Sequence, residues 1–322
     1  MSNNPRHIIQ RYYVPPLQGS NSGVWSMKEE QQSAYDGTWL PAGVIPIINY
    51  LAIGGGGSGG NATEGGTVSN GGAGGAGGLI VGSFGPTYKQ PSSIYGYTLT
   101  ITVGAGGQPI PQFPGASGNP GNGGDNTTIS GEFFTLGTLT AYGGGTGGGG
   151  AQNASQDAGN GGSGGGQGGF TGGNPYVGGS ATQPGATYGG YGNNGGKAPG
   201  LGSAGGGGAG SAASGATAGA GLFVNVANGS SYATTYGRGG SPASNRLVIA
   251  GSAEGYGSGG NGGYAAKTNP SNLGGVGQNG VVILWYNISF SAPSEITGTY
   301  TYSVQNGFRI YIFDYPGGTI TF

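Results

Sequence analysis

The sequence predicts an elongated, mainly β protein in which packed polyglycine II helices extend a β framework, with one short α-helix near the N-terminus. Glycine makes up 85 of the 322 residues, against about 7% in an average protein. Segments rich in β-branched and aromatic residues alternate with the glycine tracts, as is typical of strands separated by other elements. Charged residues are only 6% and aromatic residues 10% of the chain, a balance that disordered chains rarely have.

Residues 1–43 differ in composition from the rest and are expected to form an anchor. Ser26 and Glu29 have the spacing of a capping box, and Gly37 lies where a helix would end. So short a helix is marginal by itself, so we expect it to dock on a partner protein; the alternative is a surface helix packed by two tryptophans. The candidate attachment residues are Trp25, Met27, Tyr35 and Trp39.

The next two segments are a glycine-rich domain over residues 44–280 and a C-terminal β-segment, 281–322, that closes it. Asn306-Gly307 and Pro316-Gly317-Gly318 are both predicted to form hairpin turns. Strands are predicted at residues 44–53, 78–84, 95–104, 133–142, 222–226, 245–251, 281–290, 298–304, 308–314 and 318–322.

The glycine tracts are predicted to be structural elements because glycine recurs in them with a period of three. Residues 71–79, 161–169 and 259–264 all keep this GGX frame, and residues 143–221 carry no strand pattern. Polyproline II has three residues per turn and no internal hydrogen bonds. Its backbone groups therefore need neighbouring rods as partners, and the absence of Cβ atoms lets rods approach closely. The alternative is a flexible linker, which would be Ser-rich and poor in aromatic residues.

Packed rods would present chemically varied loops at their ends, and the tyrosines there are candidates for receptor binding. Tyrosine offers a large contact area at a low cost in conformational entropy. The alternative for each of these residues is a structural one, in which the ring caps the end of a glycine rod. The candidates are Phe170, Tyr176, Tyr188, Tyr191, Tyr232 and Tyr236.

No motif indicates a catalytic, metal or cofactor site. Gly54, Gly56 and Gly59 match G-x-G-x-x-G, but neither a helix pattern nor the required acidic residue follows. The one histidine, His7, lies in the N-terminal arm without partners that suggest catalysis or metal binding, and a serine nucleophile has no other histidine as its base. Cysteine is absent, which excludes a thiolate metal site. The carboxylates are scattered singly apart from Glu29 and its neighbour. We therefore expect no enzyme activity and no cofactor.

Charge and hydropathy also limit the classes of partner that we expect. The net charge is −1 and no basic cluster occurs, so nucleic acid is not an expected partner. No apolar run approaches the length of about 18 residues that a membrane helix needs, so we expect no membrane insertion. The N-terminus lacks the apolar region of a secretory signal.

Residues 23–41 resemble an N-terminal motif of phage virion proteins that precedes glycine-rich domains, although Leu40 separates Trp39 from Pro41. Residues 280–286 and 306–322 are similar to the closing β-segment of the glycine-rich domain of phage tail-fibre and tail-tip proteins. Successive blocks of that domain are matched by residues 48–60, 71–82, 99–107 and 121–130. A looser likeness, in the alternation of glycine tracts with aromatic loops, is to the polyglycine II tip adhesins of T-even-like phages.

This resemblance implies a virion protein, made in the host cytoplasm, that acts as a tail-fibre or spike subunit or tip adhesin. Its partners would be other fibre, tail or capsid proteins and a bacterial surface receptor, either protein or polysaccharide. The resemblance also favours a homotrimer, with one chain per fibre as the alternative. Rival functions are a non-receptor virion component such as a capsid decoration or tail connector, an ice-binding protein, for which residues 71–78 are too short, and a depolymerase spike.

Overall fold

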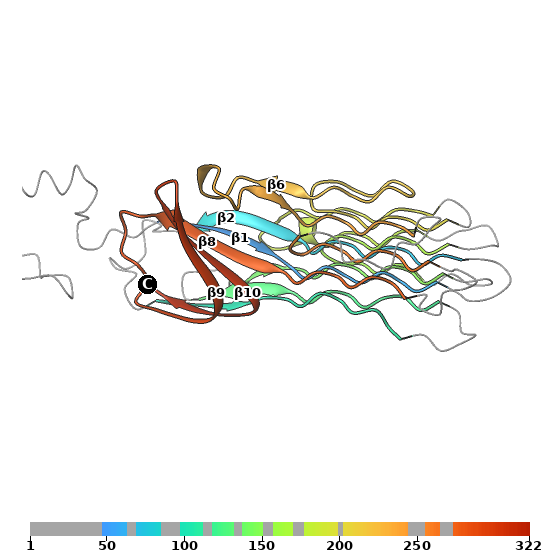
Figure 1. Cartoon of the computed structure of the whole chain (residues 1–322), viewed down its shortest axis with the longest axis horizontal. Helices are drawn as coiled ribbons and strands as arrows, with labels where there is room; N and C mark the ends of the chain where they lie inside the picture. Colours follow the sequence, from blue (N-terminus) through green and yellow to red (C-terminus); the bar gives the residue numbers. More distant parts are fainter. Residues whose placement is uncertain are drawn as a thin grey trace, which may run out of the picture.

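The computed structural model shows an elongated molecule with a β-sheet at one end and glycine tracts running side by side to the other (Figure 1). The predicted N-terminal helix and the predicted strand at residues 245–251 lie outside the described residues. Those described are residues 47–62, 69–84, 97–111, 118–131, 137–150, 157–169, 177–198, 202–243, 255–264 and 273–322.

The described part of the chain is mainly β, as predicted. Its large sheet contains eight antiparallel strands: β1 (Ile48–Ile53), β2 (Leu79–Phe84), β3 (Thr98–Thr102), β4 (Thr127–Ser130), β5 (Leu139–Ala141), β8 (Val281–Asn287), β9 (Glu295–Gln305) and β10 (Phe308–Thr321). A second sheet pairs β6 (Leu222–Val224) with β7 (Thr234–Tyr236). Two short 3-10 helices, η1 (Gln183–Gly185) and η2 (Val226–Asn228), complete the elements.

The large sheet is built around β8 and the first half of β10, which contribute side chains to the cores on both faces. Val282, Leu284 and Tyr286 of β8 enter one hydrophobic core, and Val281, Ile283 and Trp285 enter the other. This division follows from the alternation of side chains along a strand. A continuous apolar run in the sequence thus corresponds to a strand that is covered on both sides.

The long strand β10 joins two arms of the sheet. Its first half pairs with β8, which continues to β1 and β2, and its second half pairs with β3, which continues to β4 and β5. The two arms enclose the first core, which includes Ile80, Ile129 and Phe313. Because β2 also approaches β5, the sheet is nearly closed.

The second core lies on the outer face of β1, β8 and β10. There Ile53, Ile283 and Ile312 pack against Val226 and Tyr236 of the η2–β7 segment. The small β6–β7 sheet is therefore a cover for this face, and in Figure 1 it lies along the side of the large sheet.

The strand predictions are confirmed for most described segments. The predictions missed two strands, β4 and β7, which are only four and three residues long. Asn306 and Gly307 form the predicted hairpin turn, both with positive φ, as a two-residue turn requires. The prediction for Pro316-Gly317-Gly318 is wrong: these residues lie within β10, at a bulge that lets one strand turn from β8 toward β3.

The glycine tracts continue directly from the strands and are joined by backbone hydrogen bonds with a period of three. In the tract 54–62, which follows β1, the N–H groups of Gly54, Gly57 and Gly60 donate to the tract that precedes β2, over 2.8–3.0 Å. Every third N–H group counted from Gly55 donates to residues 118–126. Every third N–H group counted from Gly56 donates to residues 273–280.

The carbonyl groups of this tract accept from three further tracts. Gly55 accepts from residues 142–150, Gly56 accepts from residues 103–111, and Gly57 accepts from Gly260. Residues 54–62 therefore lie among six hydrogen-bonded neighbours. The backbone groups that a coil would leave unpaired are satisfied between tracts, as buried polar groups must be.

Glycine is required here because neighbouring backbones occupy the space of a side chain. A Cβ atom at Gly57 would lie 2.1 Å from the carbonyl oxygen of Gly145, and one at Gly74 would lie 2.0 Å from that of Gly57. The alanines of the GGX frame, Ala73 and Ala76, are fully buried. In the GGX frame, every third residue therefore carries a side chain, and it lies where the packed tracts leave room for one.

We predict that Gly57→Ala lowers the free energy of unfolding by about 3 kcal/mol, because the added methyl group overpacks the backbone contact. The control is Gly185→Ala in η1, where a Cβ atom meets nothing within 4 Å, with an expected change within about 0.5 kcal/mol. Thermal and denaturant unfolding of both variants measures the difference. Equal stability of the two variants would contradict the packing of the tracts.

Candidate functional site

The end of the molecule away from the sheet is the first candidate site, because the glycine tracts end there together (Figure 1). Near these ends, Asn61 donates its N–H to Asn119 O and accepts from Gly150 N, both over 2.8 Å. Gly169 N donates to Asn70 O over 2.8 Å. Residues from distant parts of the sequence thus lie side by side at this end of the lattice, called the tract end below.

Polar side chains link the tracts at this end. The buried Asn61 donates from Nδ2 to Ile110 O over 2.6 Å and accepts at Oδ1 from Gly274 N over 3.0 Å. Gln167, also buried, accepts at Oε1 from Ala198 N over 2.9 Å. These side chains hold neighbouring tracts in register where the chain leaves them.

Several of the predicted site residues lie outside the described residues. This applies to two of the receptor-binding candidates, Phe170 and Tyr176, whose segment follows Gly169 at the tract end. It applies equally to the four candidates for virion attachment, Trp25, Met27, Tyr35 and Trp39. Their roles stay predictions.

Tyr188 and Tyr191 lie close to the sheet. Tyr188 packs against the first core, and its buried hydroxyl has no hydrogen-bond partner among the described residues. Tyr191 exchanges two backbone hydrogen bonds with Leu79, the first residue of β2, and its side chain is 45% exposed. Of these two, Tyr191 offers a ring surface to a partner, at the junction between sheet and tracts.

Tyr232 and Tyr236 belong to the small sheet and its loop, so their expected position at a rod end is corrected. Tyr236 is only 3% exposed, and its hydroxyl donates to Tyr232 O over 2.7 Å. Burial raises the pKa of Tyr236 well above its usual value. Both rings pack against the second core, because that apolar face of the sheet must be covered.

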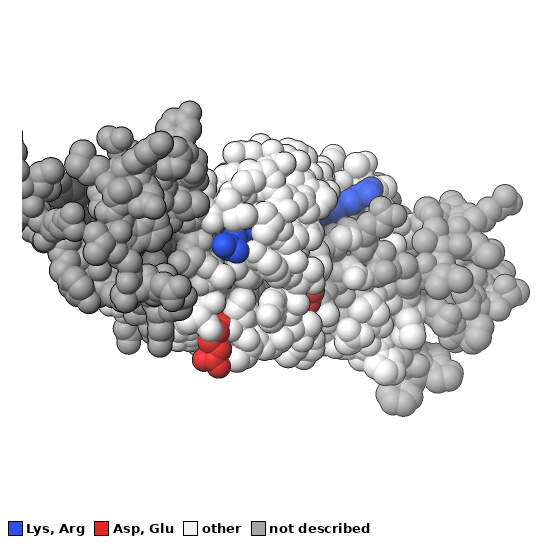
Figure 2. Space-filling view, turned by 60° about the vertical axis from the view of Figure 1, so that its left-hand side comes forward, with Lys and Arg blue, Asp and Glu red and all other residues white. Residues whose placement is uncertain are grey.

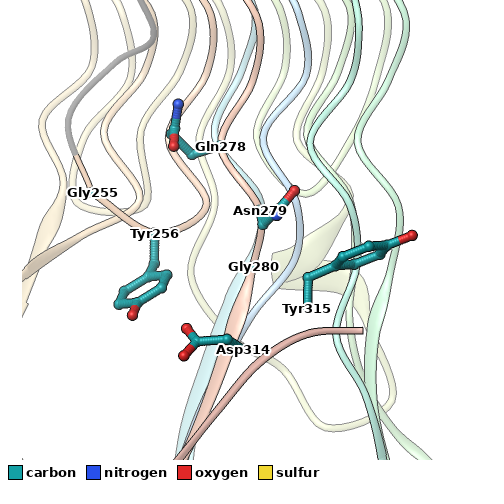
Figure 3. Close-up of a pocket in the computed structure, with 7 residues that line it drawn as sticks. All are labelled: Gly255, Tyr256, Gln278, Asn279, Gly280, Asp314 and Tyr315. Atoms are coloured by element: carbon teal, nitrogen blue, oxygen red, sulfur yellow. The ribbon is translucent and has the colours of Figure 1, made fainter. Parts of the chain in front are cut away.

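A second candidate site is a cavity of about 310 Å³ between the sheet and the tracts. Figure 3 shows the ring of Tyr256 beside the carboxylate of Asp314, with Tyr315 extending to the opposite side. Its remaining lining comes from Gly255, Gln278, Asn279 and Gly280. The site forms where β10 bulges away from the ends of two tracts.

The backbone and side-chain contacts around the cavity fix most of its wall. Gly257 N donates to Asn279 O over 2.7 Å, and Gly106 N donates to Asn279 Oδ1 over 2.9 Å. The pKa of Tyr256 is raised to about 12, first by burial and then by its hydrogen bond to Asp314 and the negative charge of that carboxylate. The protonated phenol, which donates to the Asp314 carboxylate, is therefore favoured over the phenolate.

This arrangement suits the binding of a small polar molecule. Half-exposed tyrosine rings, two amides and a carboxylate provide flat apolar surface together with donors and acceptors. Sequence reasoning missed these residues because Tyr256 and Asp314 lie in segments far apart in the chain. The charged groups visible on the face in Figure 2 are few and separate, so no strongly charged patch is present there.

The described residues contain no group of three or more His, Cys, Asp or Glu side chains placed to hold a metal ion. None of them forms a helix long and apolar enough to cross a membrane.

Comparison with known proteins finds a match to the family model described as a glycine-rich domain, over residues 31–287. The matched region ends at the last residue of β8, so β9 and β10 lie beyond it. No match is found among curated protein sequences.

We predict that the free energy of unfolding falls as the pH rises from 10 to 12, and falls less in Tyr256→Phe. The pKa of Tyr256 is about 12 in the fold against 10.0 for the ordinary group. The stability that it contributes is thus fully present below pH 10 and is lost as the pH passes through the folded value. Denaturant unfolding at several pH values measures this, with Asp314→Asn expected to lie between the two. Identical pH dependence of Tyr256→Phe and the unaltered protein would contradict it.

Proposed function

The chain belongs to the glycine-rich domain family, and we propose that it is a bacteriophage virion protein that recognises the host cell. In this proposal it is a tail-fibre or spike subunit, or the adhesin at the fibre tip, and it binds a protein or polysaccharide receptor on the bacterial surface. Binding needs no reaction or cofactor. The observation that carries the proposal is the hydrogen-bonded glycine lattice, which brings many chain segments to one end of an elongated molecule.

We further propose that the tracts are polyglycine II helices. Successive N–H groups of residues 54–62 donate to three different neighbours in rotation, and a helix with three residues per turn presents its groups in that rotation. Its bare Cα atoms permit the six-neighbour packing. Each helix is then held by its neighbours along its whole length.

Such a lattice supports recognition because it fixes the ends of the tracts. Described tracts stop at residues 62, 111, 150, 169 and 264 and resume at residues 69, 118, 157, 177 and 273, and we propose that the segments joining these ends carry the receptor contacts. Fixing the ends of a binding segment reduces the conformational entropy that is lost when it binds. Sequence changes in these segments would alter the receptor without disturbing the lattice.

The proposal also assigns opposite tasks to the two ends of the molecule. Ile48 begins β1 at the sheet end, and β1 then runs toward the tracts. The described part of the chain therefore begins at the end opposite the tract end, and the proposal assigns the anchor of residues 1–43 to that side. An anchor at one end and recognition at the other is the arrangement that a fibre-tip protein needs.

The location on the particle is tested by immunogold labelling of the intact phage with antibody against the purified protein. Gold at the distal tail fibres supports host recognition. Gold spread over the capsid contradicts the adhesin role and supports the alternative, a structural component such as a capsid decoration or a tail connector. Particles that carry no gold while control antibodies to other virion proteins label them contradict the virion assignment itself.

We predict that the purified protein competes with phage for adsorption to host cells, and that Phe170→Ala combined with Tyr176→Ala reduces this competition at least tenfold. Loss of two aromatic contacts removes much of the binding energy at a typical recognition site. The control is Phe223→Ala, which removes an aromatic ring that is 62% exposed on β6. Adsorption assays with matched concentrations of folded protein measure the effect. Equal competition by both variants would exclude the segment 170–176 from the receptor contact.

A further inference from the structure

Strand β9 forms an open edge of the large sheet. It runs for eleven residues and pairs with β10 on one side, whereas no described residue pairs with its other side. The remaining edge strands, β2 and β5, approach each other where the sheet nearly closes. Among the described strands, the outer side of β9 is therefore a long sheet edge without a neighbouring strand.

The hydrogen-bonding groups on this edge are identified by the register. Gln305 and Phe308 flank the two-residue turn, so they form a hydrogen-bonded pair, and such pairs alternate along an antiparallel ladder. Consequently Ser303 and Thr301 also direct their backbone groups toward β10. The N–H and C=O groups of the intervening residues, Tyr300, Tyr302 and Val304, point away from it.

The same three residues carry exposed apolar side chains. Tyr300, Tyr302 and Val304 are 41%, 43% and 45% exposed. Contacts with β10 fix their position, since the ring of Tyr302 stacks on Tyr311 of β10 with 4.9 Å between the ring centroids. Arg309 Nη1 also donates to the Tyr302 hydroxyl over 2.8 Å. This edge is already in the extended conformation that another strand requires.

The edge also lacks the features that keep edge strands apart. Proteins protect open edges with charged side chains, with proline or with very short strands. No charged residue and no proline occurs between Glu295 and Arg309. The register shift in the pairing of β9 with β10 lies near Gly298, so residues 300–304 form a regular, unprotected stretch between the bulge and the turn.

We propose that β9 pairs antiparallel with β9 of a second copy of this chain, about a two-fold axis at Tyr302. A two-fold axis there places Tyr302 opposite the partner's Tyr302 and Tyr300 opposite the partner's Val304. All the outward groups of the regular stretch then find partners, and no like charges meet. A second copy fits because the stretch is uncharged and its sequence, aromatic at the centre and apolar at both ends, matches itself when reversed. The proposal does not depend on receptor binding or on a virion location.

The chain contains no cysteine, so a single introduced thiol tests this pairing directly. Directly opposed residues in a hydrogen-bonded pair have Cα atoms about 5.5 Å apart, within the range that a disulfide spans. Tyr302→Cys in the full chain is therefore expected to form a disulfide-linked dimer under mild oxidation. The matched control is Tyr315→Cys, at a tyrosine that is 50% exposed outside this edge, and it is expected to stay monomeric on a non-reducing gel.

A second variant tests the pairing without a cross-link. Tyr302→Glu keeps an acceptor beside Arg309 within the chain but sets two carboxylates opposite each other in the dimer. Sedimentation is expected to show a dimer for the unaltered protein, a dissociation constant raised at least tenfold for Tyr302→Glu, and no change for Tyr315→Glu. A thermal melt verifies that each variant is folded.

Three outcomes would overturn the proposal. One is a monomer for the unaltered chain at tens of micromolar. Another is a dimer or trimer that Tyr302→Glu leaves unchanged. The third is equal cross-linking of the two cysteine variants, which would indicate random collision.

Discussion

The backbone hydrogen bonds between glycine tracts are the interaction on which the rest of this structure depends. A tract such as residues 54–62 buries a run of N–H and C=O groups, and each unpaired buried group would cost about 1–3 kcal/mol. Pairing them requires neighbours at a separation that a Cβ atom prevents, because a Cβ atom added at Gly74 would lie only 2.0 Å from the carbonyl oxygen of Gly57. The large loss of glycine entropy on folding is thus opposed by many hydrogen bonds between tracts.

The sheet provides the starting points from which the tracts extend. Tracts follow β1, β3 and β5 and precede β2, β4 and β8. The distance between neighbouring strands therefore sets the distance between the tracts where they leave the sheet. The two hydrophobic cores hold these strands, and β8 and β10 contribute side chains to both. Apolar burial is therefore concentrated at one end of the molecule, and hydrogen bonding dominates the other.

Because different interactions hold the two ends of the molecule, the two ends tolerate different sequence changes. The described lattice admits glycine, alanine and a few linking polar residues such as Asn61 and Gln167, whereas the proposed recognition rests on the segments that connect the tracts. A binding surface built on those segments would vary while its support stays the same, which suits recognition of changing receptors. The cavity beside Tyr256 belongs instead to the junction, where the bulge in β10 and the ends of two tracts determine its shape.

The sequence by itself determined which segments are strands and which are glycine tracts, because local residue patterns report local conformation. The run at residues 281–286 predicted a buried strand, Asn306-Gly307 predicted a turn, and the GGX frame predicted elements with a period of three. Only the tertiary structure decided that Pro316-Gly317-Gly318 is a bulge, that Tyr236 is buried in a core, and that Tyr256 and Asp314 share a cavity. Each of these depends on which distant segments become neighbours, and a chain with 85 glycines carries few side chains that specify those pairings in advance.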